Sequence, residues 1–350
     1  MRAVGIDPGT GSFDFFGMDE QEIIIDETVQ VKAVAENPTL LLDYIRNLLP
    51  LDIIVGPSGY GLPLTPIKDV GERELSLMVP EDKSISLYDG IRMVLRLMKS
   101  EGLPVVFTPG VIHLPTVPSF RKANKIDMGT ADKVCCAALA IKDQSEYLRI
   151  SHSETSFILV EVGYAFTAAI AVKNGMIVDG LGGTSGGPGF TALGGMDSEL
   201  AARLGNFPGS LLFSGGAKDA SGKNDFTPED MARYPVRFSE SWSMMMESIM
   251  KDVAALTIAV EKPREILISG RLSRLPAIAE YLNSNLARFG KVRAVRRQAK
   301  IAKEAAEGAF ILAEGLMGGK YESIVDALQL RKATGSMFDY VLVKEPKSFY

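Results

Sequence analysis

Cysteine and histidine are scarce in this chain, with two of each among 350 residues. Cys135 and Cys136 are adjacent, so they provide neither a disulfide framework nor the spacing of a C-x-x-C metal site. They fall in an apolar segment, where we expect reduced thiols in the core of a cytoplasmic protein. His113 and His152 are far apart in the sequence and do not have the spacing of a metal-ligand pair.

Long apolar runs and excess positive charge are also missing. No run reaches the roughly 18 apolar residues that a membrane-spanning helix requires, so we expect no membrane partner. The opening residues, MRAVGIDPGTG, enter a turn too early for the apolar region of a signal peptide. The net charge of −5 does not favour nucleic acid as a partner. A basic run from Arg288 to Lys303 leaves a nucleic-acid or acidic-partner surface open, but it lacks interleaved aromatic residues, which favours a solvated face.

The sequence has room for two domains and repeats one order of elements. Since one domain commonly holds about 150 residues, the chain is expected to form two α/β lobes, 1–150 and 151–330, and a C-terminal extension, 331–350. Apolar periodicity and turn signals predict strand–strand–strand–helix–strand–helix twice, starting near residues 2 and 156. The predicted strands are 2–7, 12–18, 21–27, 52–55 and 104–107, then 156–162, 165–172, 176–179, 265–269 and 291–295. The predicted helices are 39–49, 85–100, 130–142, 239–260, 274–288, 302–317 and 320–331, whereas 59–83 is predicted to be irregular.

The first candidate phosphate site is the turn after the first strand. Its sequence is Asp7-Pro8-Gly9-Thr10-Gly11-Ser12. The backbone N–H groups of Gly9, Thr10, Gly11 and Ser12 are predicted to bind phosphate oxygens, because glycine lets the main chain approach a ligand closely. The acidic Asp7 is predicted to hold Mg²⁺ through water. A purely structural hairpin turn remains the alternative.

A second turn of the same kind opens the other half of the chain. Glu161 ends a strand there, and Gly163, Tyr164 and Thr167 follow it as predicted nucleotide-binding residues. One acid–glycine turn is weak evidence, but two at equivalent positions of a repeat predict twin clamps around one polyphosphate.

Two further glycine segments are candidates for the same site. Gly270 and Arg271 follow an apolar strand and form a bare backbone corner on which a nucleotide base or ribose can rest. An ordinary strand-to-helix turn is the alternative there. Gly182 and Gly183 begin a glycine-rich loop that is predicted to border the substrate, with a mobile surface loop as the alternative.

Together these motifs resemble the superfamily of acetate and sugar kinases, Hsp70 chaperones and actin. V-G-I-D-P-G-T-G is similar to its first phosphate motif, V-E-V-G-Y-A-F-T to its second, and I-L-I-S-G-R to its adenosine motif. The small residues of Ala305–Ala309 resemble a helix that packs closely between the lobes. The resemblance implies a duplicated ribonuclease-H-like, actin-like ATPase fold with ATP and Mg²⁺ in a central cleft.

Within that superfamily the carboxylate kinases are most similar, and the whole chain resembles an archaeal family called predicted butyrate kinases. Met128-Gly-Thr-Ala-Asp132-Lys133 is similar to the acetate kinase motif H-G-T-S-H-K. Met128 and Asp132 stand where that motif has histidines, and Glu161 stands where the second phosphate motif has one. The resemblance is therefore more complete for the nucleotide-binding motifs than for the residues of the acyl-kinase reaction.

The implied function is an ATP-dependent kinase for a short-chain carboxylate such as acetate or butyrate. Lys133 or Arg121 would stabilise the transferring phosphoryl group, and Asp132 or Glu161 would orient a nucleophile or a metal-bound water. Arg121 lies in a proline-bounded basic loop that faces either an acidic substrate or solvent. The expected partners are a nucleotide and a small carboxylate, with a homodimer left open. An ATP-binding regulator or slow ATPase of the same fold is the alternative function; carbamoyl activation is less favoured, since it usually needs closely spaced histidines.

Overall fold

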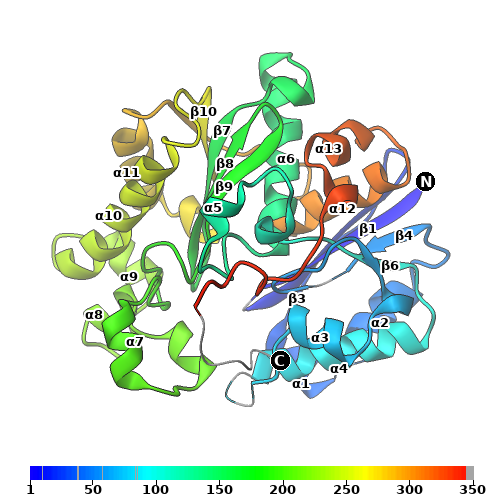
Figure 1. The fold of residues 1–350 in the computed structure, drawn as a ribbon, viewed down its shortest axis with the longest axis horizontal. Helices are drawn as coiled ribbons and strands as arrows, with labels where there is room; N and C mark the ends of the chain where they lie inside the picture. The colour runs from blue at the N-terminus through cyan, green and yellow to red at the C-terminus, as the bar shows by residue number, and fades with distance from the viewer. Residues whose placement is uncertain (10, 38, 57, 83, 85, 344–350) are drawn as a thin grey trace.

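The computed structural model describes residues 1–9, 11–37, 39–56, 58–82, 84 and 86–343 (Figure 1). Its framework is a six-stranded sheet of order β3-β2-β1-β4-β6-β5 and a five-stranded sheet of order β11-β10-β7-β8-β9. The first sheet contains β1 (Arg2–Pro8), β2 (Ser12–Asp19), β3 (Glu22–Gln30), β4 (Ile53–Val55), β5 (Thr65–Pro66) and β6 (Val105–Phe107). The second contains β7 (Phe157–Val162), β8 (Thr167–Lys173), β9 (Met176–Leu181), β10 (Glu265–Ser269) and β11 (Lys291–Ala294).

The two sheets repeat one topology. In the first, β1, β2 and β3 form an antiparallel meander, and β4 and β6 continue the sheet parallel to β1. In the second, β7, β8 and β9 form the meander, and β10 and β11 continue parallel to β7. The predicted duplication is therefore confirmed, and it places the β1–β2 and β7–β8 turns at equivalent positions of two lobes.

Helices form three layers around these sheets. The first sheet is covered on its outer face by α1 (Val31–Glu36), α2 (Leu40–Arg46), α3 (Glu72–Met78) and α4 (Ser86–Ser100). The second is covered by α10 (Ser239–Leu256) and α11 (Pro276–Leu286), with α8 (Ala217–Ala220) and α9 (Pro228–Arg233) packed on them. Between the sheets lie α6 (Ala131–Leu148), α12 (Glu304–Leu316) and α13 (Glu322–Ala327). The short helices α5 (Ser119–Lys122) and α7 (Ser198–Leu204) lie in connecting segments.

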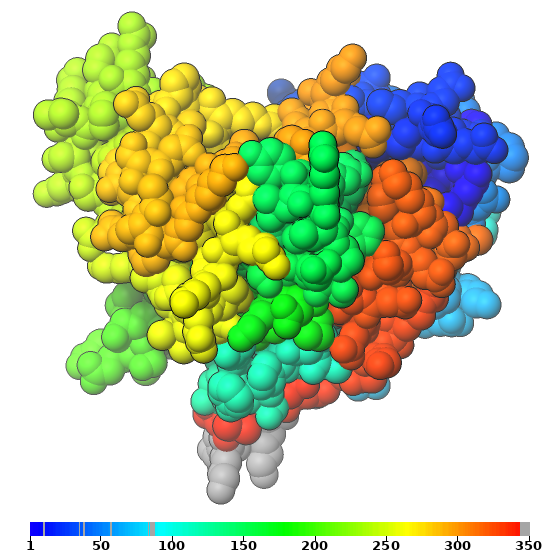
Figure 2. Space-filling view, turned by 90° about the horizontal axis from the view of Figure 1, so that it is seen from above, coloured from blue at the N-terminus to red at the C-terminus, as the bar shows by residue number. Residues whose placement is uncertain are grey.

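The central layer packs closely because small residues line it. A Cβ on Gly308 of α12 would overlap the backbone carbonyl of Cys135 in α6, and one on Gly5 of β1 would overlap Ala306 of α12. The predicted small-residue helix is thus found between the lobes. In Figure 2 the blue N-terminal residues and the yellow residues of the second lobe lie on opposite sides of the green and orange-red segments that include this layer. Cys135 and Cys136 are free and buried there, as predicted.

Some elements differ from the sequence prediction. α3 forms inside the segment predicted to be irregular, where Gly71 N–H donates to the Glu74 carboxylate at 2.9 Å and begins the helix. α6 continues to Leu148 and ends at Arg149, which has a left-handed conformation. The chain after 333 packs on the loop before α6, where Asn124 N–H donates to the carbonyl of Tyr340 at 2.9 Å. Across the described residues, no helix has the length and apolar character to cross a bilayer.

Candidate functional site

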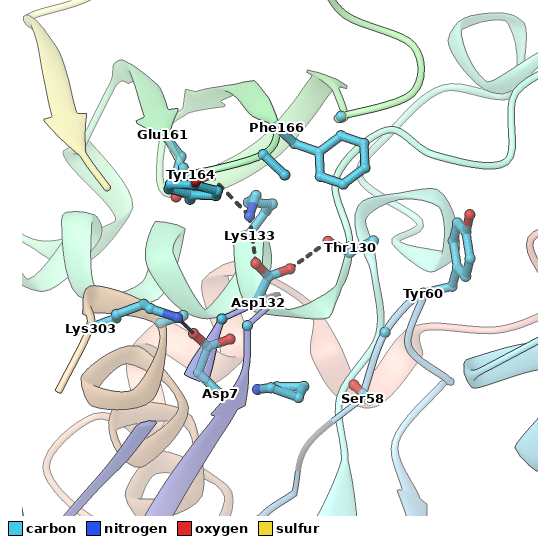
Figure 3. A pocket seen from close by; sticks show the side chains of 18 of the residues that line it. Asp7, Ser58, Tyr60, Thr130, Asp132, Lys133, Glu161, Tyr164, Phe166 and Lys303 are labelled. Atoms are coloured by element: carbon cyan, nitrogen blue, oxygen red, sulfur yellow. Dashed lines mark hydrogen bonds and ion pairs between the residues drawn. The ribbon is translucent and has the colours of Figure 1, made fainter. Parts of the chain in front are cut away.

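A cavity of about 350 Å³ lies between the two lobes, where the β1–β2 and β7–β8 turns meet the first turns of α6 and α12 (Figure 3). It is lined by twelve of the residues predicted from the sequence: Asp7, Gly9, Gly11, Ser12, Asp132, Lys133, Glu161, Gly163, Tyr164, Gly183, Gly270 and Arg271. Thr10 lies outside the described residues. The two turns that were predicted to act together therefore open onto one shared space.

The two turns have the same internal geometry. Gly9 N–H donates to the carbonyl of Ser12 at 2.9 Å, and Gly163 N–H donates to the carbonyl of Phe166 at 3.0 Å. In both, an acid lies two residues before the glycine. In each case the hydrogen bond closes a tight turn whose glycine lines the cavity. Such a turn leaves room for an oxygen-rich ligand close to the backbone.

Each turn's acid is paired with a lysine from the other half of the chain. Lys303, which directly precedes α12, places Nζ 3.6 Å from Asp7 and 3.0 Å from Asp14. Lys133, in the first turn of α6, places Nζ 3.1 Å from Glu161 and also contacts Asp132. Both helices begin at the cavity, and helix N-termini carry partial positive charge that favours phosphate.

Burial sets the protonation of these groups. It raises the pKa of Asp7 to about 7, with Lys303 opposing the shift, and it raises the pKa of Glu161, with Lys133 opposing. Burial also raises the pKa of Asp132, but the Lys133 ammonium and the Thr130 hydroxyl together bring that pKa below its usual value. The cavity therefore keeps an ionised Asp132 beside Lys133.

The lysines stay charged in spite of their burial. Burial lowers the pKa of Lys133, yet Asp132 and Glu161 raise it well above its ordinary value. Lys303 is affected in the same way: burial lowers its pKa, and Asp7 and Asp14 raise it overall. Two ammonium groups thus face the space between the turns.

The corner after β10 joins this arrangement. Gly270 has a φ of +93°, and a Cβ there would lie 2.5 Å from the carbonyl oxygen of Val162, so only glycine fits against the end of β7. The next residue, Arg271, lines the cavity and donates from a terminal guanidinium nitrogen to the Ser12 hydroxyl at 3.5 Å. This contact joins the two lobes across the cavity.

The glycine-rich loop is held at the entrance of α6. Asp127 accepts from Gly129 N–H at 2.9 Å and from Thr184 N–H at 3.0 Å. Gly183 lines the cavity, whereas Gly182 does not; a Cβ on Gly182 would overlap the Asp127 carboxylate. The loop therefore contributes backbone to the wall of the site.

The chain matches, over residues 5–343, the model of a family described as protein of unknown function DUF1464. The chain belongs to this family. No curated protein matches it in sequence. Its structure is similar to an acetate kinase from Entamoeba histolytica, with a TM-score of 0.62 and 10% identity over 89% of this chain and 99% of that one.

Two further solved structures give the same result. A propionate kinase from Francisella tularensis has a TM-score of 0.61 and 14% identity, over 87% of this chain and 98% of that one. An acetate kinase from Porphyromonas gingivalis has a TM-score of 0.59 and 13% identity, over 88% and 98%. At these identities the likeness shows the fold: a duplicated, actin-like two-lobe α/β architecture.

Three predicted site residues lie elsewhere. Arg121 donates to the carbonyl of Val178 at 2.8 Å and lies 3.5 Å from Asp179, so it is tied to β9 and does not line the cavity. Its predicted catalytic role is not supported by the geometry. Thr167 is buried at the start of β8, with its hydroxyl 3.5 Å from the carbonyl of Gly187. Gly182 is the third, because it does not line the cavity.

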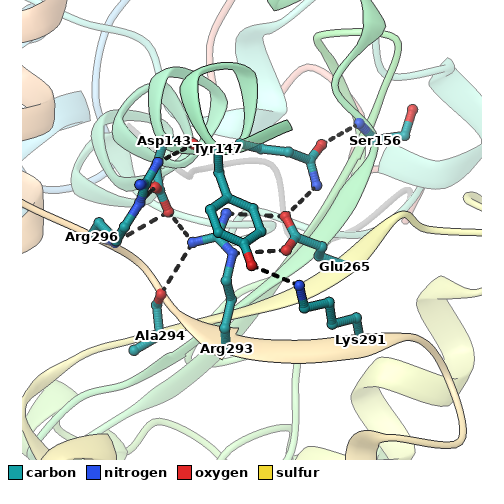
Figure 4. Close-up of polar contacts among 9 residues, drawn as sticks. Asp143, Tyr147, Ser156, Glu265, Lys291, Arg293, Ala294 and Arg296 are labelled. Atoms are coloured by element: carbon teal, nitrogen blue, oxygen red, sulfur yellow. Dashed lines mark hydrogen bonds and ion pairs between the residues drawn. The ribbon is translucent and has the colours of Figure 1, made fainter. Parts of the chain in front are cut away.

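Three arginines of the basic run make contacts within the protein. Arg293 pairs with Asp143 and Glu265, and Arg296 pairs with Asp143 at 2.5 Å (Figure 4). Arg297 donates to the carbonyl of Ala302 at 2.5 Å. Arg293 and Arg296 thus hold β11 and the segment after it against α6 and β10, and part of the positive charge of the run is paired with acids of the same chain.

Sequence reasoning missed several residues that line the cavity: Ser58, Tyr60, Asp127, Thr130, Lys303 and Glu304. In the sequence, Lys303 is recognisable only as the last residue of the basic run. Its position directly before the small-residue helix was the available signal, because that helix was expected between the lobes. The apolar wall described below had no signal, since its side chains come from segments far apart in the sequence.

The donor set around Asp7 fits Mg²⁺. This ion takes oxygen ligands, and in nucleotide sites one or two carboxylates with waters and phosphate oxygens complete its shell. Asp7 supplies such a carboxylate at the floor of the cavity. Within the described residues no group of three His, Cys, Asp or Glu side chains could by itself hold a metal ion.

Proposed function

We propose that the protein is an ATP-dependent kinase whose acceptor is a small carboxylate. The observation that carries this is the pair of equivalent glycine turns, Gly9–Ser12 and Gly163–Phe166, that open onto one cavity from two lobes. Two such turns with a lysine beside each provide main-chain donors and positive charge for a polyphosphate. The lobes 1–150 and 151–330 are proposed as the units that close on it, with 331–350 as an extension.

The nucleotide would occupy the cavity from the Gly270 corner to the two turns. Arg271 and the backbone at Gly270, which line the cavity, would contact the ribose or base, and the two turns would contact the phosphates. Asp7 would hold Mg²⁺, which supplies charge neutralisation for the phosphate oxygens when bound. Lys303 would hold the Asp7 carboxylate in place from the other lobe.

The acceptor chemistry needs charge stabilisation rather than a base. A carboxylate is already ionised near neutral pH, so no proton must be removed before its oxygen attacks the terminal phosphorus. A new oxygen–phosphorus bond forms while the bond to the ADP oxygen breaks, giving an acyl phosphate and ADP. Lys133 would stabilise the charge on the transferring group, and its ion pairs with Asp132 and Glu161 would orient its ammonium.

A slow ATPase or nucleotide-dependent regulator is the second candidate. The observation in its favour is that Lys133 already contacts two carboxylates inside the cavity. An anionic acceptor must approach in spite of that negative charge, whereas water has no such barrier.

A turnover assay separates the two candidates. Purified protein with Mg-ATP is incubated with a panel of carboxylates, and acyl phosphate is trapped with hydroxylamine while ADP is measured. The kinase predicts ADP formation that an acid stimulates, and a Lys133→Ala variant that loses about 100- to 1000-fold in kcat. Arg121→Ala, which removes a cation outside the cavity, is the matched control. ADP formation that no acid stimulates would support the ATPase instead.

A further inference from the structure

The cavity is chemically unequal from one end to the other. In Figure 3 Lys303 and Asp7 lie at one end and Tyr60 at the other, with Asp132 and Thr130 between them. Apolar and aromatic side chains also line the cavity, among them Tyr60, Met78, Ile91, Phe166, Leu212 and Phe213. One acid, Asp127, lines the cavity near this group: burial and the Asp127 carboxylate together raise the pKa of Tyr60. The cavity-lining cations among the described residues are Lys133, Arg271 and Lys303, all at the phosphate end.

Both lobes build the apolar end. Met78 ends α3 and Ile91 lies in α4, on the first lobe. Phe166 ends the second glycine turn and packs edge-on against Phe213, with ring centroids 5.1 Å apart. Tyr60, Phe166 and Phe213 are only partly buried, so apolar surface remains open toward the cavity.

Hydrogen bonds between the lobes close this end. Gly209 N–H donates to the Asp82 carboxylate at 2.8 Å, and Ser210 N–H donates to the Ser84 hydroxyl oxygen at 3.0 Å. Gly209, Ser210, Leu212 and Phe213 all belong to one 3-10 helix, Gly209–Phe213. The second lobe therefore holds Leu212 and Phe213 against the first lobe, beside Phe166 at the end of the second glycine turn and away from the Asp7–Lys303 pair.

We propose that the acceptor is a carboxylate with an apolar group of aromatic-ring size, which lies among Tyr60, Phe166 and Phe213. This inference rests on the proposed kinase function. The carboxylate faces the phosphate end, because the cations lie there, and the ring fills the apolar end. A two-carbon acid would leave most of the apolar wall uncovered, whereas burying apolar surface is the main source of affinity in such a site.

Substrate size is the direct test. The kcat/KM values for acetate, butyrate, hexanoate and 3-phenylpropionate are measured at saturating Mg-ATP. Each methylene that becomes buried is worth about fourfold, so 3-phenylpropionate is expected to exceed acetate by on the order of 100-fold. Acetate or butyrate performing as well as 3-phenylpropionate would overturn the inference while leaving the kinase function standing.

Two variants locate the effect in the apolar wall. Phe213→Ala is expected to lower the ratio of the 3-phenylpropionate kcat/KM to the acetate kcat/KM by about 10-fold or more, and Leu212→Trp, which fills the space, should lower it as well. Phe120→Ala is the matched control, since that ring is 74% exposed and lies outside the cavity. A ratio that none of the wall variants changes would contradict the proposed placement of the ring.

A binding measurement separates this inference from the kinase function. Calorimetric titration of 3-phenylpropionate and of acetate is carried out with Mg²⁺ and a non-hydrolysable ATP analogue present. Binding of 3-phenylpropionate that Phe213→Ala weakens, without turnover of any acid, would support the apolar site and overturn the kinase. Failure of 3-phenylpropionate to bind more tightly than acetate would overturn the apolar site whatever the turnover assay shows.

Discussion

The ammonium of Lys303 lies 3.6 Å from the carboxylate of Asp7, which joins the start of α12 to the end of β1. The same ammonium lies 3.0 Å from the buried Asp14. Gly9 makes this approach possible, because a Cβ there would overlap Lys303 Nζ. The last large helix of the fold thus places a cation directly over the first glycine turn, and both nucleotide binding and stability should depend on it.

Replacing Lys303 with methionine removes this cation at nearly constant size. Mg-ATP is expected to bind about 10- to 100-fold more weakly, because a charge-assisted contact to phosphate is lost. The free energy of unfolding should fall by about 1–3 kcal/mol, less than for a fully buried pair because the lysine side chain is 23% exposed. Calorimetric titration and urea denaturation measure the two effects. Lys300→Met, at an exposed position of the same segment, should change neither the Mg-ATP affinity nor the free energy of unfolding. An unchanged Mg-ATP affinity in Lys303→Met would contradict the placement of Lys303 at the phosphate end.

The central helix crossing gives a prediction about packing. Gly308→Ala adds a methyl group where the backbone of Cys135 already lies, so it should destabilise the fold by about 1–3 kcal/mol. Gly90→Ala is the matched control in α4, where a Cβ meets no atom within 4 Å. Because alanine is a better helix former than glycine, this control should stabilise by about 0.5–1 kcal/mol. Urea denaturation of both variants tests the opposite signs, and a neutral Gly308→Ala would show that the helices can separate at no cost.

The sequence predicts the parts of this molecule that local patterns encode. The two meanders and their acid–glycine turns follow from alternation and turn residues that lie within a few positions of one another. The placement of Gly270 likewise follows from a strand that ends in a bare corner. The meanders and their turns occur twice along the chain, and this repetition makes them recognisable.

Long-range pairings were not encoded locally. Arg121 lies in a loop that looks exposed in the sequence. In the fold its guanidinium donates to the carbonyl of Val178 and forms an ion pair with Asp179, both in β9. Arg293 belongs to a basic run whose acidic partners lie on α6 and β10. The apolar end of the cavity likewise combines segments that only the folded chain brings together.

Arg293 is a shared cation for two buried acids. Asp143 and Glu265 are each 1% exposed, and Arg293 contacts both, while Gln144 donates to Glu265 at 3.0 Å. Arg293→Met leaves the buried Glu265 without its cation, whereas Asp143 keeps Arg296, so the variant should be less stable by about 3–5 kcal/mol. Lys291→Met is the control, because its ammonium donates to the hydroxyl of the exposed Tyr147 at 2.7 Å (Figure 4). Its loss should change the free energy of unfolding by less than about 1 kcal/mol. Thermal and urea denaturation would contradict this account if the two variants were equally stable.

His113 gives a pH dependence of stability. Burial lowers its pKa to about 4 in the folded chain, whereas an unfolded histidine titrates near its ordinary value of about 6.5. Between these values the unfolded chain binds a proton that the folded chain does not, so stability falls as the pH drops from 6.5 toward 4 and is unaffected by this group above that window. Over this whole pH window the shifted pKa of His113 lowers the free energy of unfolding by about 3 kcal/mol. His113→Gln should remove this part of the slope, whereas His152→Gln, at a less buried site, should remove less. Urea denaturation at pH 7 and pH 5 measures how far the free energy of unfolding falls between these pH values in the wild type and in each variant. An equal fall in the wild type and in His113→Gln would show that His113 takes up its proton in the folded chain as readily as in the unfolded one.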